Sequence, residues 1–132
     1  MSEKSILVFK HMPSQNPGIF RNFAEKQNIR FVEIDLHAGE EIPDLTLYDG
    51  LWVMGGSMNV WEEDKYPWLI EEKKAIKCAV QELNMPFLGI CFGHQLLAEA
   101  IGGRAEKTDQ YEVGLFEIEP TKEGQDHPLL NN

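Results

Sequence analysis

Residues 86–103, with the sequence PFLGICFGHQLLAEAIGG, constrain the fold of this chain more than any other segment. The apolar run from Pro86 to Ile90 predicts a short strand, and the residues after Cys91 predict an amphipathic helix that ends at two glycines. Gly89 and Gly93 stand on either side of the cysteine, as a sharp turn with closely approaching backbone requires. A strand that turns into a helix at one reactive residue is a nucleophile elbow.

Cys91 stands at the predicted helix N-terminus, where the helix dipole favours the thiolate. The thiolate is the nucleophilic form of cysteine, so we expect Cys91 to act in covalent catalysis. The alternative is a buried structural cysteine, which would not need a glycine two residues away on each side. Cys78 provides the contrast, because it lies in a predicted helix among apolar residues and is expected to pack in the core.

The rest of the chain alternates apolar runs with helical patterns. Strands are expected at Ser5–Lys10, Arg30–Leu36, Leu51–Met54, Pro86–Ile90, Gly103–Lys107 and Glu112–Glu119, and helices at Ile19–Asn28, Trp68–Leu83 and after Cys91. This order predicts an α/β fold with a doubly wound, mostly parallel sheet and helices on both faces. Active sites in such sheets lie at the carboxyl ends of the strands. Gly55, Gly56 and Cys91 all follow strand ends, so they should lie side by side.

A nucleophile that attacks a carbonyl carbon needs hydrogen-bond donors for the oxyanion that develops. The backbone N–H of Phe92 would supply one donor, because it follows the nucleophile. Gly56 is expected to supply the second, since a glycine lets its N–H turn toward the site without a Cβ in the way. The alternative for Gly55 and Gly56 is a tight turn that needs positive φ.

Composition limits the classes of protein that fit. The 132 residues support a single domain, residues 1–132, and 22 acidic against 12 basic residues give a net charge of -10. That charge argues against binding to nucleic acid or to an anionic membrane. Two cysteines make no disulfide framework, and neither a secretory pattern nor a membrane-spanning run is visible, so we expect a cytoplasmic protein. Neither a metal cluster nor a phosphate-binding loop is visible, and no cofactor is expected.

The segments VMGGSMNV and FLGICFGHQLLAEAIGG together resemble the class I (triad) glutamine amidotransferases. The resemblance is closest to stand-alone members that are similar to the amidotransferase domain of GMP synthase. It implies a flavodoxin-like fold in which Cys91 forms a γ-glutamyl thioester with glutamine and releases ammonia. It further implies that Gly56 and Phe92 hold the oxyanion, that Gly55 and Gln95 bind the substrate, and that a synthetase domain or subunit accepts the ammonia.

A cysteine nucleophile also needs a base, usually a histidine oriented by a carboxylate. The family carries these as a His-x-Glu pair downstream of the cysteine. The four histidines here are His11, His37, His94 and His127, and none is followed two residues later by Glu. We therefore expect the N-terminal portion of a longer protein, or a truncated relative, that lacks the C-terminal part of the fold and has weak activity or none without a downstream His and Glu.

The four histidines are expected to be structural, with His11 in a solvent-facing loop at a strand end. Residues 71–74 are expected to form a charged outer helix face. Three functions stay open: an amidotransferase that feeds ammonia to an acceptor, a γ-glutamyl hydrolase or peptidase on the same scaffold, and a non-catalytic regulatory module. A more distant family with a cysteine elbow is disfavoured by Gly55, Gly56 and Gln95.

Overall fold

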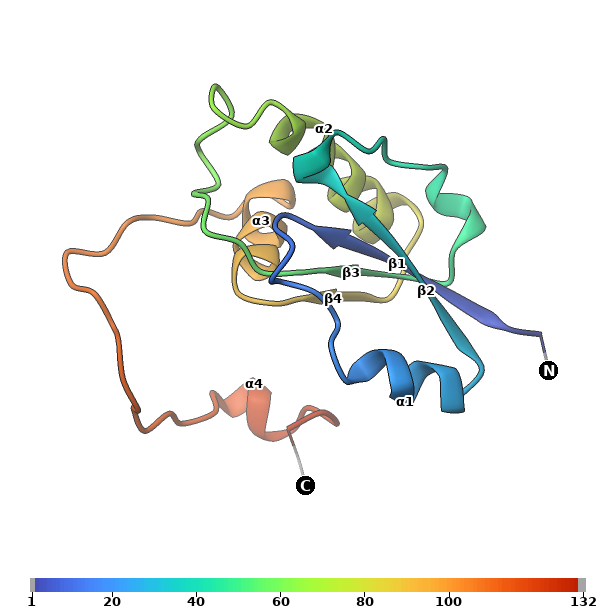
Figure 1. Cartoon of the computed structure of the whole chain (residues 1–132). Coiled ribbons are helices and arrows are strands. Elements are labelled where there is room, and N and C mark those ends of the chain that lie inside the picture. The colour runs from blue at the N-terminus through green and yellow to red at the C-terminus, as the bar shows by residue number, and fades with distance from the viewer. Residues whose placement is uncertain (1, 131–132) are drawn as a thin grey trace.

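A computed structural model describes residues 2–130 and contains a parallel four-stranded sheet (Figure 1). The strands are β1 (Lys4–Lys10), β2 (Ile29–Asp35), β3 (Gly50–Val53) and β4 (Phe87–Gly89). Their order across the sheet is β2-β1-β3-β4, and each neighbouring pair is parallel. The carboxyl ends of all four strands therefore meet at one edge, as the sequence predicts.

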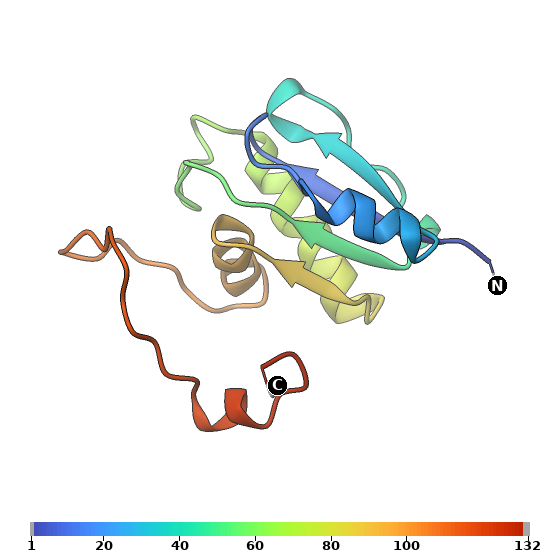
Figure 2. The same cartoon turned by 60° about the horizontal axis from the view of Figure 1, so that its bottom comes forward.

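Helices cover both faces of this sheet (Figures 1 and 2). The helix α1 (Phe20–Lys26) lies on one face, while α2 (Trp68–Lys77) and α3 (Phe92–Ala100) lie on the other. A π-helical turn, Cys78–Glu82, continues α2, and short 3-10 turns cover Leu36–Ala38 and Leu45–Leu47. The doubly wound α/β architecture is confirmed. No helix in residues 2–130 has the length and apolarity needed to cross a membrane.

The main core fills the space between the sheet and the helices α2 and α3. Its fully buried side chains include Leu7, Phe9, Leu51, Val53, Leu69, Ile76, Phe92 and Leu96. A smaller cluster of Val8, Trp52 and Met54 lies on the other face. There, α1 buries only Ala24, and the apolar side chains of Ile19, Phe20 and Phe23 are each more than half exposed. Burial of apolar area drives this packing, so the face carrying α2 and α3 supplies most of the stability.

Two predicted strands do not form, and these predictions are wrong. Residues 103–107 and 112–119 adopt no regular structure, and Figure 1 shows this part of the chain running away from the sheet before the short helix α4 (Lys122–Gln125). Val113 and Leu115 are at least 88% exposed. Alternation of apolar and polar residues is a pattern of half-buried strands, but a strand also needs a neighbour to accept its backbone hydrogen bonds. No described strand lies beside these residues.

Candidate active site

The turn between β4 and α3 has the geometry of a nucleophile elbow. β4 ends at Gly89, α3 begins at Phe92, and Cys91 occupies the N-cap with φ 52° and ψ -103°. A side chain at positive φ is strained by about 1–3 kcal/mol, and such strain gathers at functional sites. The Cys91 side chain is exposed and its thiol is free. The predicted strand, bend and helix around this cysteine are confirmed.

Both glycines of the elbow are needed for close backbone contacts. A Cβ at Gly89 would stand 2.7 Å from the carbonyl carbon of Gly93. A Cβ at Gly93 would overlap the carbonyl oxygen of Val53. Backbone therefore packs on backbone where α3 meets the ends of β3 and β4, as the glycines in the sequence predict.

The glycines after β3 lie beside the elbow, as expected. A Cβ at Gly55 would stand 3.8 Å from the Cβ of Cys91, and one at Gly56 would stand 3.1 Å from the ring of Phe92. Within residues 2–130, the backbone N–H groups of Gly56 and Phe92 donate no hydrogen bond to a backbone oxygen. These two donors lie on adjacent segments near Cys91, and N–H groups without an acceptor are candidates to bind a ligand oxygen.

Behind these glycines lies a buried pair, His11 and Glu72. The two atoms His11 Nε2 and Glu72 Oε1 are 2.7 Å apart, and both side chains are fully buried. The expectation of a solvent-facing loop at His11 is therefore wrong, as is the expectation that residue 72 belongs to a charged outer face. A signal for Glu72 was present in the sequence, since Leu69, Glu72 and Ile76 follow helical spacing on one buried stripe.

The second ring nitrogen of His11 fixes its tautomer. His11 Nδ1 lies 2.9 Å from the carbonyl oxygen of Gly55, and a carbonyl can only accept, so Nδ1 carries a proton. Burial lowers the pKa of His11, but the hydrogen bond and charge of Glu72 outweigh it, and the pKa is raised. Burial raises the pKa of Glu72, although His11 opposes this. Because both nitrogens are engaged, His11 has none free to accept a proton from Cys91.

The remaining predicted residues are not joined to this arrangement by side-chain hydrogen bonds within residues 2–130. Gln95 is exposed on α3, and its backbone N–H donates to the Cys91 carbonyl at 3.2 Å. His94 is also exposed on α3. His37 Nδ1 lies 4.0 Å from Asp35 Oδ1, and His127 Nδ1 accepts a hydrogen bond from the Leu129 N–H. The described residues contain no group of three His, Cys, Asp or Glu side chains that could hold a metal ion.

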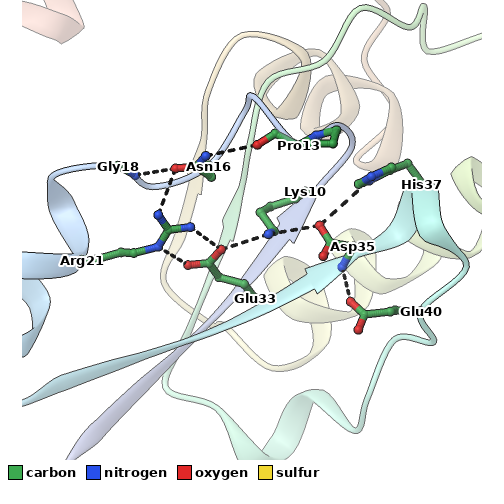
Figure 3. A network of polar contacts seen from close by, with 9 residues as sticks. All are labelled: Lys10, Pro13, Asn16, Gly18, Arg21, Glu33, Asp35, His37 and Glu40. Carbon is green, nitrogen blue, oxygen red and sulfur yellow. Dashed lines mark hydrogen bonds and ion pairs between the residues drawn. The ribbon is translucent and has the colours of Figure 1, made fainter.

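A network of charged and polar side chains holds the loop that follows β1 (Figure 3). Arg21 on α1 donates to both oxygens of Glu33 at 2.6 and 2.7 Å. Asn16 accepts from Arg21 and from the Gly18 N–H, and its side chain donates to the Pro13 carbonyl. This loop carries the side chain of another residue to the elbow.

That residue is Gln15, which was not predicted from the sequence. A Cβ at Gly55 would stand only 2.9 Å from Gln15 Oε1 and 3.8 Å from the Cβ of Cys91. The carboxamide of Gln15 therefore lies over Gly55, next to the elbow. No local pattern marks this residue, because its position depends on how the loop folds back over β3.

A family model described as "Glutamine amidotransferase class-I" matches residues 14–131 of the chain. Glutamine amidotransferase-like protein YfeJ of Salmonella typhimurium is 31% identical over 124 residues, covering 91% of this chain and 52% of that protein. GMP synthase [glutamine-hydrolyzing] of Brachyspira hyodysenteriae is 39% identical over 67 residues, covering 51% of this chain and 12% of that protein. Gamma-glutamyl peptidase 4 of Arabidopsis thaliana is 36% identical over 67 residues, covering 51% of this chain and 26% of that protein.

Solved structures that superpose on this chain are also described as glutamine amidotransferases. A glutamine amidotransferase from Thermotoga maritima superposes with a TM-score of 0.71 at 32% identity, covering 76% of this chain and 44% of that one. A glutamine amido transferase from Methylobacillus flagellatus gives a TM-score of 0.75 at 29% identity, covering 86% of this chain and 45% of that one. The chain spans about half of the length of the curated relatives it matches, or less.

Proposed function

The chain belongs to the class I glutamine amidotransferase family, and from this premise we propose that it binds glutamine and cleaves the side-chain amide through Cys91. One observation carries the proposal: an exposed thiol on a strained bend lies beside two backbone N–H groups, of Gly56 and Phe92, that have no backbone acceptor within residues 2–130. Strained backbone positions lower the stability of a fold and are found mainly at functional sites, and donors beside a nucleophile can stabilise a developing oxyanion.

The chemistry follows from these groups. The Cys91 thiolate attacks the amide carbon of the glutamine side chain, a C–S bond forms, and the carbonyl electron pair moves onto oxygen. The N–H groups of Gly56 and Phe92 hold that oxyanion. The C–N bond then breaks, the nitrogen takes a proton and leaves as ammonia, and water hydrolyses the γ-glutamyl thioester to glutamate.

The proton that leaves with ammonia requires a general acid and base. The buried pair of His11 and Glu72 does not fill this role, because both ring nitrogens of His11 are engaged. We assign the role to a histidine and a carboxylate outside residues 2–130. We further assign Gly55, Gln95 and the newly found Gln15 to the substrate pocket, and the ammonia to a synthetase domain or subunit like that of GMP synthase.

A γ-glutamyl hydrolase or peptidase is the second candidate. The similarity to gamma-glutamyl peptidase 4 of Arabidopsis thaliana favours it. The same thioester would form on Cys91, but the leaving group would be the amine of a γ-glutamyl peptide instead of ammonia. The two functions share a nucleophile and differ in what the pocket admits next to the scissile bond.

A glutamine-mimicking chloroketone tests both candidates on the protein at its full natural length. We expect an adduct on Cys91, located by mass spectrometry, and protection by added glutamine. Cys78 is the internal control, because partial burial and the nearby carboxylate of Glu82 raise the pKa of its thiol. Ammonia release from glutamine then supports the amidotransferase, whereas turnover of γ-glutamyl peptides alone supports the peptidase. A Cys91 that reacts no faster with the chloroketone than with iodoacetamide would rule out both.

A further inference from the structure

We propose that the buried pair of His11 and Glu72 positions the oxyanion hole, by fixing the peptide group between Gly55 and Gly56 against the elbow. The inference rests on the proposed function, because it concerns the same donors. His11 and Glu72 are positioning residues in this role and touch no reacting atom. Three features of the structure lead to it.

The first feature is the planarity of the peptide group. The carbonyl of Gly55 and the N–H of Gly56 belong to one trans peptide, so they point in opposite directions. His11 Nδ1 donates to that carbonyl at 2.9 Å and holds it on the buried side. The N–H of Gly56 is thereby turned away from the buried pair. Glycines have few steric restraints of their own, so this hydrogen bond is what selects the orientation.

The second feature is the contact of His11 with the elbow itself. The imidazole ring meets the Phe92 ring edge to face, with centroids 5.0 Å apart and an interplanar angle of 87°. The same ring also stacks on Trp68 of α2, with centroids 5.5 Å apart and an interplanar angle of 15°. A Cβ at Gly56 would also stand only 3.2 Å from the Cβ of His11. One ring therefore touches both segments that carry the proposed oxyanion donors.

The third feature is the cost of burying Glu72. Within residues 2–130, its carboxyl oxygen Oε2 is buried and has no hydrogen-bond partner. A buried polar group without a partner destabilises a fold, and an apolar side chain of similar volume would avoid that cost. Glu72 provides a hydrogen-bond partner for His11 Nε2. This contact fixes the orientation of the ring, so that the proton on Nδ1 stays directed at the Gly55 carbonyl.

Two alkylating reagents separate positioning from folding. Iodoacetamide needs only an accessible thiolate at Cys91, whereas the glutamine-mimicking chloroketone presents a carbonyl oxygen to the oxyanion donors. The ratio of the two alkylation rates at Cys91 therefore measures the oxyanion hole. It is to be measured on the full-length protein for the wild type and for Glu72→Leu, Glu72→Gln and His11→Gln. The exposed neighbour gives the matched control, Glu71→Gln.

We expect the ratio to fall at least tenfold in Glu72→Leu and His11→Gln, since loss of one oxyanion donor costs about 100-fold or more. Glu72→Gln should keep the ratio within about threefold of the wild type, because the N–H of a side-chain amide can donate to an unprotonated Nε2 and leave the proton on Nδ1. Glu71→Gln should not change it. Unchanged ratios in Glu72→Leu and His11→Gln that still unfold cooperatively would overturn the inference.

A spectroscopic measurement covers the case in which those variants do not fold. The ¹⁵N chemical shifts of the wild-type His11 ring should show a protonated Nδ1 at neutral pH. An Nδ1 without a proton would overturn the inference, because the Gly55 carbonyl would then have no donor. This outcome is distinct from failure of the proposed function, in which wild-type Cys91 shows no preference for the chloroketone whatever the state of His11.

Discussion

Gly93 lies directly against the carbonyl group of Val53, so that a Cβ at residue 93 would stand 2.8 Å from the carbonyl carbon and overlap the oxygen. This contact joins the first turn of α3 to the end of β3. It sets the distance between the elbow and the two glycines that follow β3. The position of Cys91 relative to Gly56 thus depends on residue 93 being a glycine, which has no Cβ.

The first prediction concerns this contact. Gly93→Ala should destabilise the fold by about 3 kcal/mol, because the added methyl forces two backbone segments apart. Urea unfolding at neutral pH measures the change. Gly124→Ala in α4 is the control, since its Cβ would meet only ordinary contacts of 3.4 Å or more, and it should change the free energy by less than about 1 kcal/mol. Equal midpoints for the two variants would contradict the close approach of Gly93.

The second prediction concerns the strain at Cys91, whose φ is 52°. Cys91→Gly should be more stable than Cys91→Ala by about 1 kcal/mol, because glycine adopts positive φ without a Cβ penalty but loses more chain entropy on folding. Both variants lose the thiol, so thermal or urea unfolding compares them without any difference in reactivity. A Cys91→Gly variant that is the less stable of the two would show that the bend is unstrained.

Local patterns were enough to predict the four strands that form, the helices α1, α2 and α3, and the elbow, but not the short helix α4. The glycines around Cys91 and the apolar runs of β1 and β3 carry their information within a few residues. The same kind of pattern failed at residues 112–119, because a strand is completed by a neighbour that the alternation itself does not supply. Periodicity describes which face of an element is apolar and leaves open whether anything covers it.

The buried pair shows a different limit. His11 and Glu72 are 61 residues apart in the chain, and their contact exists only once α2 has docked on the sheet beside β1. His11 stands between a strand and a proline-rich loop, which favours exposure, and Glu72 stands in a run of charges. Only the helical spacing of Glu72 relative to Leu69 and Ile76 predicts that it is buried. This spacing does not identify His11 as its partner.

The third prediction concerns the charged network around Glu33 in Figure 3. Arg21 donates two hydrogen bonds to the Glu33 carboxylate, and Lys10 lies 3.0 Å from it. These groups hold the pKa of the Glu33 carboxyl below its ordinary value, with Arg21 the main cause, although burial opposes them. A carboxyl whose pKa is lowered by folding stabilises the fold when it is ionised.

The direction of the pH dependence follows. The stabilisation is complete above the pKa of an unfolded glutamate, about 4.3, and is lost as the pH falls through the lower pKa of the folded state. Glu33→Gln should therefore be less stable than the wild type by about 1 kcal/mol at pH 7, a value at the upper end for exposed ion pairs because the Arg21 contact is bidentate. Between pH 5 and roughly pH 3 the difference should shrink toward zero.

Urea midpoints at several pH values between 7 and 3 measure this convergence. Glu71→Gln is again the matched control, since Glu71 and its partner Lys74 are each 68% exposed and their single ion pair should contribute little at any pH. A difference between Glu33→Gln and the wild type that persists unchanged at pH 3 would mean that the carboxylate charge is not what stabilises this edge of the sheet. A difference between the hydrogen bonds of a neutral carboxyl group and those of the carboxamide would then be the cause, because the two side chains share the same stem.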